Sequence, residues 1–119
     1  MNNVSLIGNL VKDAELKVLP GTDGETVLEF TLAWTDHIKK KDGTTEKKSQ
    51  FIDCAVYKQY GRDIEKSMVK GLRVGLEGAL QYSSWKSDDG ATRSKHRLLV
   101  KHVDFLSDKR DEPVADSGE

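Results

Sequence analysis

Apolar side chains alternate with polar ones over most of this chain, and only one segment replaces the alternation with helical spacing. Period-two alternation indicates strands with one face on a core, whereas spacing of three to four residues indicates a helix. The helical segment, residues 60–70, places Ile64, Met68 and Val69 on one stripe. Gly8, in the first strand, predicts a bulge or a close approach of another backbone. The predicted strands are residues 3–11, continuing after a bend as 14–19, then 25–35, 49–58, 72–82 and 93–106.

Five strands with one short helix between the third and the fourth predict an all-β fold, the five-stranded OB-fold barrel. An immunoglobulin-like sandwich requires about seven strands and no helix, so this chain has too few strands for it. Two loops of an OB-fold hold oligonucleotides or oligosaccharides, and in this sequence they correspond to residues 19–26 and 83–93. Residues 37–48 are polar and are expected to form a long loop around Asp42 and Gly43.

With 119 residues, the chain is long enough for one domain with an ordinary core and too short for two. Its formal charge of -1 is unevenly distributed. The last thirteen residues carry five acids against two bases, so residues 1–106 have a formal charge of +2. A weakly basic body permits nucleic-acid binding without requiring it. We therefore expect an OB-fold domain over residues 1–106 and a short acidic, disordered tail over residues 107–119.

A single cysteine excludes an internal disulfide, and Cys54 alternates with apolar neighbours, so we expect a buried thiol in a reducing compartment. No signal peptide and no apolar run long enough to cross a bilayer is visible. These features predict a soluble, cytoplasmic protein that associates with the nucleoid if it binds DNA. The spacing of Cys54, His37, His96 and His102 does not match a metal site, so we expect no metal and no other cofactor.

Three aromatic residues are placed where a protein that stacks nucleic-acid bases needs them. Phe51 and Tyr57 are six residues apart in one predicted strand, so both rings leave the same face, and Trp85 precedes a turn at residues 87–90. Exposed rings bind unpaired bases without sequence preference because every base has a π-face. Strand aromatics can also be covered by a loop or a subunit. Trp34 shares its parity with the core residues of its strand, which leaves a core role and a binding role equally open.

Cationic residues flank these aromatics and are candidates for phosphate contacts. A charge run is usually a solvated surface, and each phosphate contact would be weak and sensitive to salt. The candidates are Lys39, Lys40, Lys41, Lys47 and Lys48 in the polar loop, Lys58, Lys70 and Arg73 on either side of the helix, and Lys86, Arg93 and Lys95 around the last turn. The predicted nucleic-acid-binding set is Trp34, Lys39, Phe51, Tyr57, Lys58, Lys70, Arg73, Trp85, Lys86 and Arg93.

In this order, the segments resemble the bacterial single-stranded DNA-binding protein family over about residues 1–106. The resemblance rests on residues 1–10, 13–15, 29–33 and 69–78, on Phe51 and Tyr57, and on Trp85 with its Asp-Gly turn. It implies sequence-independent binding and protection of single-stranded DNA in replication, recombination and repair. It also implies a homo-oligomer, with a tetramer favoured and a dimer as the alternative, and no catalysis. Residues 116–119 lack the acidic, apolar tip through which the family recruits repair proteins, so we do not expect recruitment through this tail.

Two other functions remain open on the sequence alone. A metal-dependent hydrolase on an OB barrel requires several convergent carboxylates, and only Asp53 and Glu77 share the predicted binding face. A protein-interaction module similar to primosomal protein B would have the same fold and would be dimeric. Ile52 stands where the family commonly has a histidine at its subunit contact, so the sequence does not decide the assembly.

Overall fold

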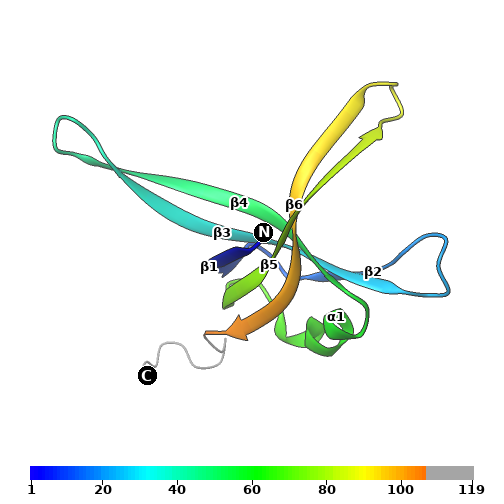
Figure 1. Cartoon of the computed structure of the whole chain (residues 1–119). Helices are drawn as coiled ribbons and strands as arrows, with labels where there is room; N and C mark the ends of the chain where they lie inside the picture. Colours follow the sequence, from blue (N-terminus) through cyan, green and yellow to red (C-terminus); the bar gives the residue numbers. More distant parts are fainter. Residues whose placement is uncertain (107–119) are drawn as a thin grey trace.

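The computed structural model describes residues 1–106, and the acidic tail predicted for residues 107–119 lies outside the described part. Figure 1 shows strands over almost the whole of the described chain, with one short helix. The elements are β1 (Val4–Leu10), β2 (Glu15–Val18), β3 (Thr26–Lys39), β4 (Thr45–Tyr57), α1 (Lys58–Ile64), a 3₁₀ helix (Glu65–Ser67), β5 (Arg73–Lys86) and β6 (Thr92–Phe105).

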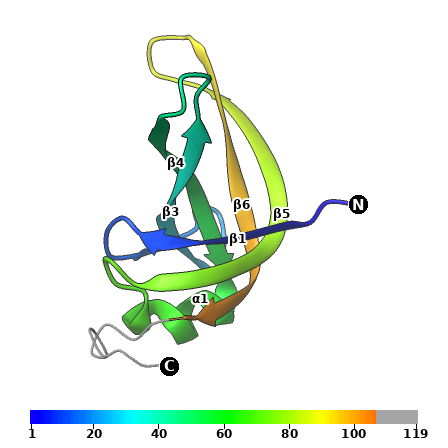
Figure 2. The same ribbon diagram turned by 90° about the vertical axis from the view of Figure 1, so that its left-hand side faces the viewer.

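The strands form a sheet in the order β1-β5-β6-β4-β3-β2, and an additional pairing of β1 with β3 closes it into a barrel. Neighbouring strands are antiparallel except β4 and β6, which are parallel. β2 continues the first strand after a bend and pairs with β3. The predicted five-stranded barrel with one helix before the fourth long strand is therefore confirmed. Figure 2 shows α1 at one end of the barrel and two long hairpins, β3–β4 and β5–β6, projecting from the other end.

The core is supplied by residues of β1, β3, β4, β5 and β6, and alternate residues of β3 and β4 point into it, as the period-two pattern predicts. Leu28, Leu32 and Val56 are fully inaccessible to solvent. Met68, which follows the 3₁₀ helix, is also buried in this core. Fully burying an aliphatic side chain of this size contributes about 1.5–3 kcal/mol. Cys54 is buried among these residues, which confirms the prediction, and burial raises the pKa of its thiol to about 12.

At two glycines of the barrel, another strand's backbone approaches so closely that a side chain would not fit. A Cβ atom on Gly8 would lie 2.4 Å from the carbonyl oxygen of Ala33, so the close approach predicted for Gly8 is the correct alternative. The irregularity in the barrel lies instead in β5, where the pairing with β6 shifts register between Glu77 and Gly78. A Cβ atom on Gly78 would lie 2.0 Å from the carbonyl oxygen of Leu99.

The loop predicted for residues 37–48 is wrong. β3 and β4 stay paired as far as Lys39 and Thr45, which leaves only a tight turn whose ends are joined by a hydrogen bond from the Lys40 N–H to the Thr44 carbonyl. A two-stranded ribbon with both faces in solvent needs no apolar alternation, so its sequence resembles that of a loop. β5 likewise continues beyond the predicted end at residue 82 as far as Lys86.

The helix is shorter than the predicted 60–70. α1 begins directly at the end of β4 and ends at Ile64, after which the chain tightens into the 3₁₀ helix. Two contacts attach α1 to the barrel: the Tyr60 hydroxyl accepts a hydrogen bond from the Val103 N–H (2.8 Å), and Arg62 Nη1 donates to Thr26 Oγ1 (2.8 Å). The stripe that predicted a longer helix is therefore divided between α1 and the turn that precedes β5.

Candidate nucleic-acid interface

The outer face of β4, β6 and β5 carries three of the predicted aromatics, although β4 is paired with β6 only over residues 53–55 and the β3–β4 and β5–β6 hairpins diverge beyond that stretch (Figure 1). The parallel pairing of β4 with β6 places Asp53 opposite Arg97, and β5 pairs with β6 along the whole projecting hairpin. Side chains on neighbouring strands that are in register point to the same side of a sheet. Phe51, Tyr57 and Trp85 therefore share this face, which we call the outer aromatic face.

The three rings differ in accessibility. Phe51 is 61% exposed and Trp85 is 45% exposed, so both rings offer a surface to a ligand. Tyr57 is half-buried, its hydroxyl accepts a hydrogen bond from Arg97 Nη2, and the Arg97 guanidinium carbon lies 5.8 Å from its ring centroid. This cation–π contact restricts the orientation of the Tyr57 ring. Phe51 and Trp85 are thus free to stack, whereas Tyr57 is already held by the protein.

Trp34 lies on the opposite side of the sheet from these rings. It is half-buried and packs against the core cluster, on the same side of β3 as Phe30 and Leu32. This packing favours the core role of the two that the sequence left open for Trp34.

The predicted cations near the projecting hairpins accompany the outer aromatic face. Arg93 lies directly opposite Trp85 in the β5–β6 hairpin, and its Nη2 atom is 3.5 Å from Asp89 Oδ2. Lys86 follows Trp85 on the same strand and is exposed, but alternation directs it to the opposite face of the hairpin end. Lys58 directly follows Tyr57, and Lys39 is exposed at the far end of the β3–β4 hairpin.

Lys70 and Arg73 are not brought together with the aromatic rings. The Lys70 N–H donates to Asp13 Oδ1 (2.8 Å), and Arg73 Nη1 lies 3.5 Å from Asn9 Oδ1 at the start of β5. Trp85 lies near the other end of this strand, and a strand rises about 3.3 Å per residue, which corresponds to about 40 Å along the backbone. These two cations therefore belong to a different part of the surface.

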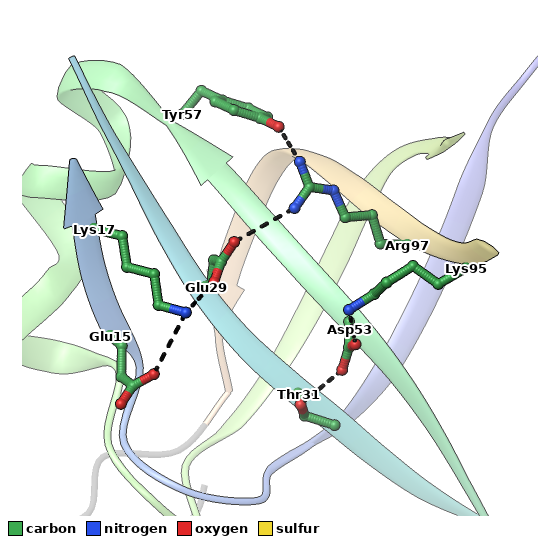
Figure 3. Close-up of polar contacts among 8 residues, drawn as sticks. All are labelled: Glu15, Lys17, Glu29, Thr31, Asp53, Tyr57, Lys95 and Arg97. Carbon is green, nitrogen blue, oxygen red and sulfur yellow. Dashed lines mark hydrogen bonds and ion pairs between the residues drawn. The ribbon is translucent and has the colours of Figure 1, made fainter. Parts of the chain in front are cut away.

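Sequence reasoning missed an ion-pair network on the outer aromatic face (Figure 3). Two carboxylates each bind more than one partner. Asp53 Oδ2 is 2.6 Å from Lys95 Nζ, and Asp53 Oδ1 accepts a hydrogen bond from Thr31 Oγ1 (2.9 Å). Glu29 Oε1 is 2.8 Å from Lys17 Nζ, and Glu29 Oε2 is 3.4 Å from Arg97 Nη1. We call these residues the carboxylate network.

The network changes the titration of its members. The hydrogen bond from Lys95 is the largest of the causes that lower the pKa of Asp53, and the Thr31 hydroxyl acts in the same direction. Glu29 raises the pKa of Lys17. Arg97 is not among the cations singled out from the sequence, although a signal for it was present there. Arg93, Lys95 and Arg97 occupy every second position of β6, and this spacing places all three on one face.

A hollow of about 160 Å³ opens over the network and has room for several water molecules. Its lining includes Lys17, Glu29, Asp53, Lys95 and Arg97.

Among residues 1–106, no three His, Cys, Asp or Glu side chains are grouped so that they could hold a metal ion. No helix in that same stretch is both long and apolar enough to span a membrane.

A closed five-stranded barrel of this topology places the chain in the class of OB-fold proteins. The Single-strand binding protein family matches residues 1–106, and the chain belongs to this family, which confirms the resemblance noted in the sequence.

Curated relatives agree with this assignment. The Single-stranded DNA-binding protein of Helicobacter pylori is 32% identical over 116 residues, which cover 98% of this chain and 64% of the relative. Single-stranded DNA-binding protein 3 of Clostridium acetobutylicum is 40% identical over 106 residues, which cover 89% of this chain and 71% of the relative. The chain spans just under two thirds of the Helicobacter pylori protein and 62% of the corresponding protein of Helicobacter hepaticus.

Solved structures share the fold. The Plasmodium falciparum SSB complex with ssDNA superimposes with a TM-score of 0.80 at 24% identity, covering 90% of this chain and 96% of that one. A deletion mutant of the single-stranded DNA binding protein from Thermus aquaticus gives a TM-score of 0.79 at 23% identity, covering 93% of this chain and 52% of that one.

Proposed function

We propose that this chain binds single-stranded DNA without sequence preference and without catalysing a reaction on it. The observation that carries the proposal is the outer aromatic face, on which Phe51 and Trp85 expose their rings from two hairpins of one sheet. Stacking on such rings contributes about 1–3 kcal/mol per base and tolerates any sequence. Membership of the Single-strand binding protein family and the names of its relatives support DNA as the ligand.

In this proposal each predicted residue has a defined role. Phe51 and Trp85 stack bases, and Tyr57 offers its ring beside them. Phosphates are contacted by cations around these rings, namely Lys39, Lys58, Lys86 and Arg93. Trp34, Lys70 and Arg73 lie away from the outer aromatic face, so they would contact DNA only where a longer strand wraps around the barrel.

We further propose that the chain forms a homotetramer, with a dimer as the alternative, and protects single strands during replication, recombination and repair. Its place of action would be the cytoplasm, at the nucleoid. Light scattering on the protein alone and with an oligo-dT separates tetramer from dimer. A dimeric protein that does not bind the oligo-dT would favour the alternative function, a protein-interaction module.

The main test is a fluorescence titration with poly-dT. We expect quenching of tryptophan fluorescence, and we expect the Trp85→Phe variant, which retains only Trp34, to lose most of it. On a log-log plot, affinity should fall with salt by ~0.7 for each phosphate neutralised. Absence of quenching by any single strand, DNA or RNA, would refute the proposal.

Alanine substitutions localise the site. Phe51→Ala and Trp85→Ala should each weaken binding by about 1–3 kcal/mol while leaving thermal unfolding nearly unchanged, because both rings are largely exposed. Tyr82→Ala is the matched control, since Tyr82 is 62% exposed on the same strand as Trp85 and pairs with His96 on the opposite face. Equal losses of affinity in Tyr82→Ala and Trp85→Ala would place the site elsewhere.

A further inference from the structure

The carboxylate network lies where a bound strand would have to pass. Asp53 is between Phe51 and Tyr57 on the same face of β4, and its side chain binds Lys95 of the adjacent strand. A DNA strand whose bases stack on Phe51 and that continues past Tyr57 therefore carries its phosphates close to a carboxylate. A negative charge at this point opposes binding, so it requires an explanation.

We infer that Asp53 and Glu29 are internal competitors of the DNA phosphates: they hold Lys95 and Arg97 in ion pairs, and a bound strand takes these cations over. The inference rests on the proposed function and deepens it, because it assigns two further phosphate-contacting residues and two residues that limit affinity. The carboxylates occupy the positions that phosphate oxygens occupy in the bound state.

The two pairs differ in how easily a phosphate can displace them. Lys95 and Asp53 have side chains that are 45% and 46% exposed, and exposed ion pairs are weak. Arg97 and Glu29 are 24% and 33% exposed, and Arg97 is also bonded to Tyr57. Lys95 is therefore the cation released first, whereas Arg97 remains held to the Tyr57 ring until a phosphate enters the hollow.

The charge balance of the network determines the consequence for binding. Glu15 lies 4.0 Å from Lys17, so the network contains three carboxylates and three cations and has no net formal charge. When a phosphate replaces a carboxylate on Lys95, no additional cation becomes neutralised by the DNA. Fewer counterions are then released than the number of cations on the face suggests, and the dependence of affinity on salt is shallow.

The test compares Asp53→Asn with the wild-type chain in titrations with fluorescently labelled oligo-dT over a range of salt concentrations. Asparagine keeps an oxygen for the Thr31 hydroxyl but leaves Lys95 without its carboxylate partner. We expect binding to be tighter by about fivefold at low salt. The salt slope should steepen by about 0.7, the value for one additional phosphate neutralised. Asp53→Ser removes the same charge with a smaller side chain and should act in the same direction.

The matched control is Asp63→Asn on α1. Asp63 also accepts a side-chain hydrogen bond, from Gln59 Nε2 at 2.6 Å, and its substitution changes the net charge by the same amount away from the outer aromatic face. We expect its affinity and salt slope to equal those of the wild type. Adding Lys95→Gln to Asp53→Asn should cancel the gain, because the released cation is then missing.

The outcomes separate the two proposals. If the wild type binds oligo-dT but Asp53→Asn binds equally or more weakly with the same salt slope, the competition is refuted and the proposed function stands. An equal gain in Asp63→Asn also refutes it, because net charge alone would then explain the effect. If the wild type binds no oligonucleotide, both proposals fail together.

Discussion

The close approach of β5 and β6 at Gly78 allows a quantitative prediction about stability. In Gly78→Ala the new Cβ atom would lie 2.0 Å from the Leu99 carbonyl oxygen, 2.9 Å from its carbonyl carbon and 3.0 Å from Val100 Cα. All three atoms belong to the backbone, so no side chain can rotate to make room. To restore an ordinary contact of 3.4 Å to the oxygen, the two strands must separate by more than about 1 Å.

A separation of this size breaks the β5–β6 hydrogen bonds on both sides of Gly78. A buried backbone group left without a partner costs about 1–3 kcal/mol, so two such groups lower the free energy of unfolding by about 2–6 kcal/mol. The whole free energy of unfolding of a domain is about 5–15 kcal/mol. For a domain of this size each kcal/mol corresponds to about 4–8 °C in Tm, so we expect Tm to fall by at least about 8 °C.

Thermal and urea unfolding followed by circular dichroism measure this change. Gly43→Ala is the control, because Gly43 has φ of 90° in the β3–β4 turn and no atom within 4 Å of its Cβ position. In that variant the free energy of unfolding should fall only by the cost of placing alanine in a left-handed backbone conformation, about 1–2 kcal/mol. A Tm for Gly78→Ala equal to or above that for Gly43→Ala would refute the reasoning.

Three further predictions concern buried or paired side chains. Cys54, with its pKa raised to about 12, should resist iodoacetamide at pH 8 in the native chain and react only in urea, as mass spectrometry would report; labelling of the folded chain would contradict its burial. Met68→Ala should lower the free energy of unfolding by about 2–5 kcal/mol, and a loss below about 1 kcal/mol in urea titration would contradict its core position. The pKa of Asp53 lies below its ordinary value of 3.8 in the folded chain, where the carboxylate faces Lys95 and Arg97. Its contribution to stability is therefore present above that value and lost as pH falls through the lower folded pKa, so the stability difference between wild type and Asp53→Asn should be largest near pH ~6 and vanish in strong acid. A difference independent of pH would contradict this.

The order of elements could be predicted because each long strand presses one face on the core. Leu28, Leu32 and Val56 alternate with polar neighbours, and that local pattern gave the strand positions before any contact was known. The same parity argument placed Phe51 on the side away from the core, where it is exposed. These properties depend only on neighbouring residues in one strand.

Features that depend on pairing between distant strands could not be predicted. The β3–β4 ribbon beyond Trp34 has solvent on both faces, so no apolar alternation marks it as a strand. The contacts of Arg97 with Glu29 and Tyr57 require the parallel register of β4 and β6, which no local pattern encodes. The sequence therefore predicted the aromatic rings of the candidate site but not the ion pairs that surround them.

The parallel pairing of β4 with β6 also determines when this surface comes into existence. Asp53 meets Lys95 only after the last strand of the described barrel has been made, so a chain emerging from the ribosome carries the Phe51 strand long before its partner strand is available. Closing contacts between such distant segments is slow compared with forming local hairpins. The proposed DNA-binding face is thus completed only once β6 has docked against β4.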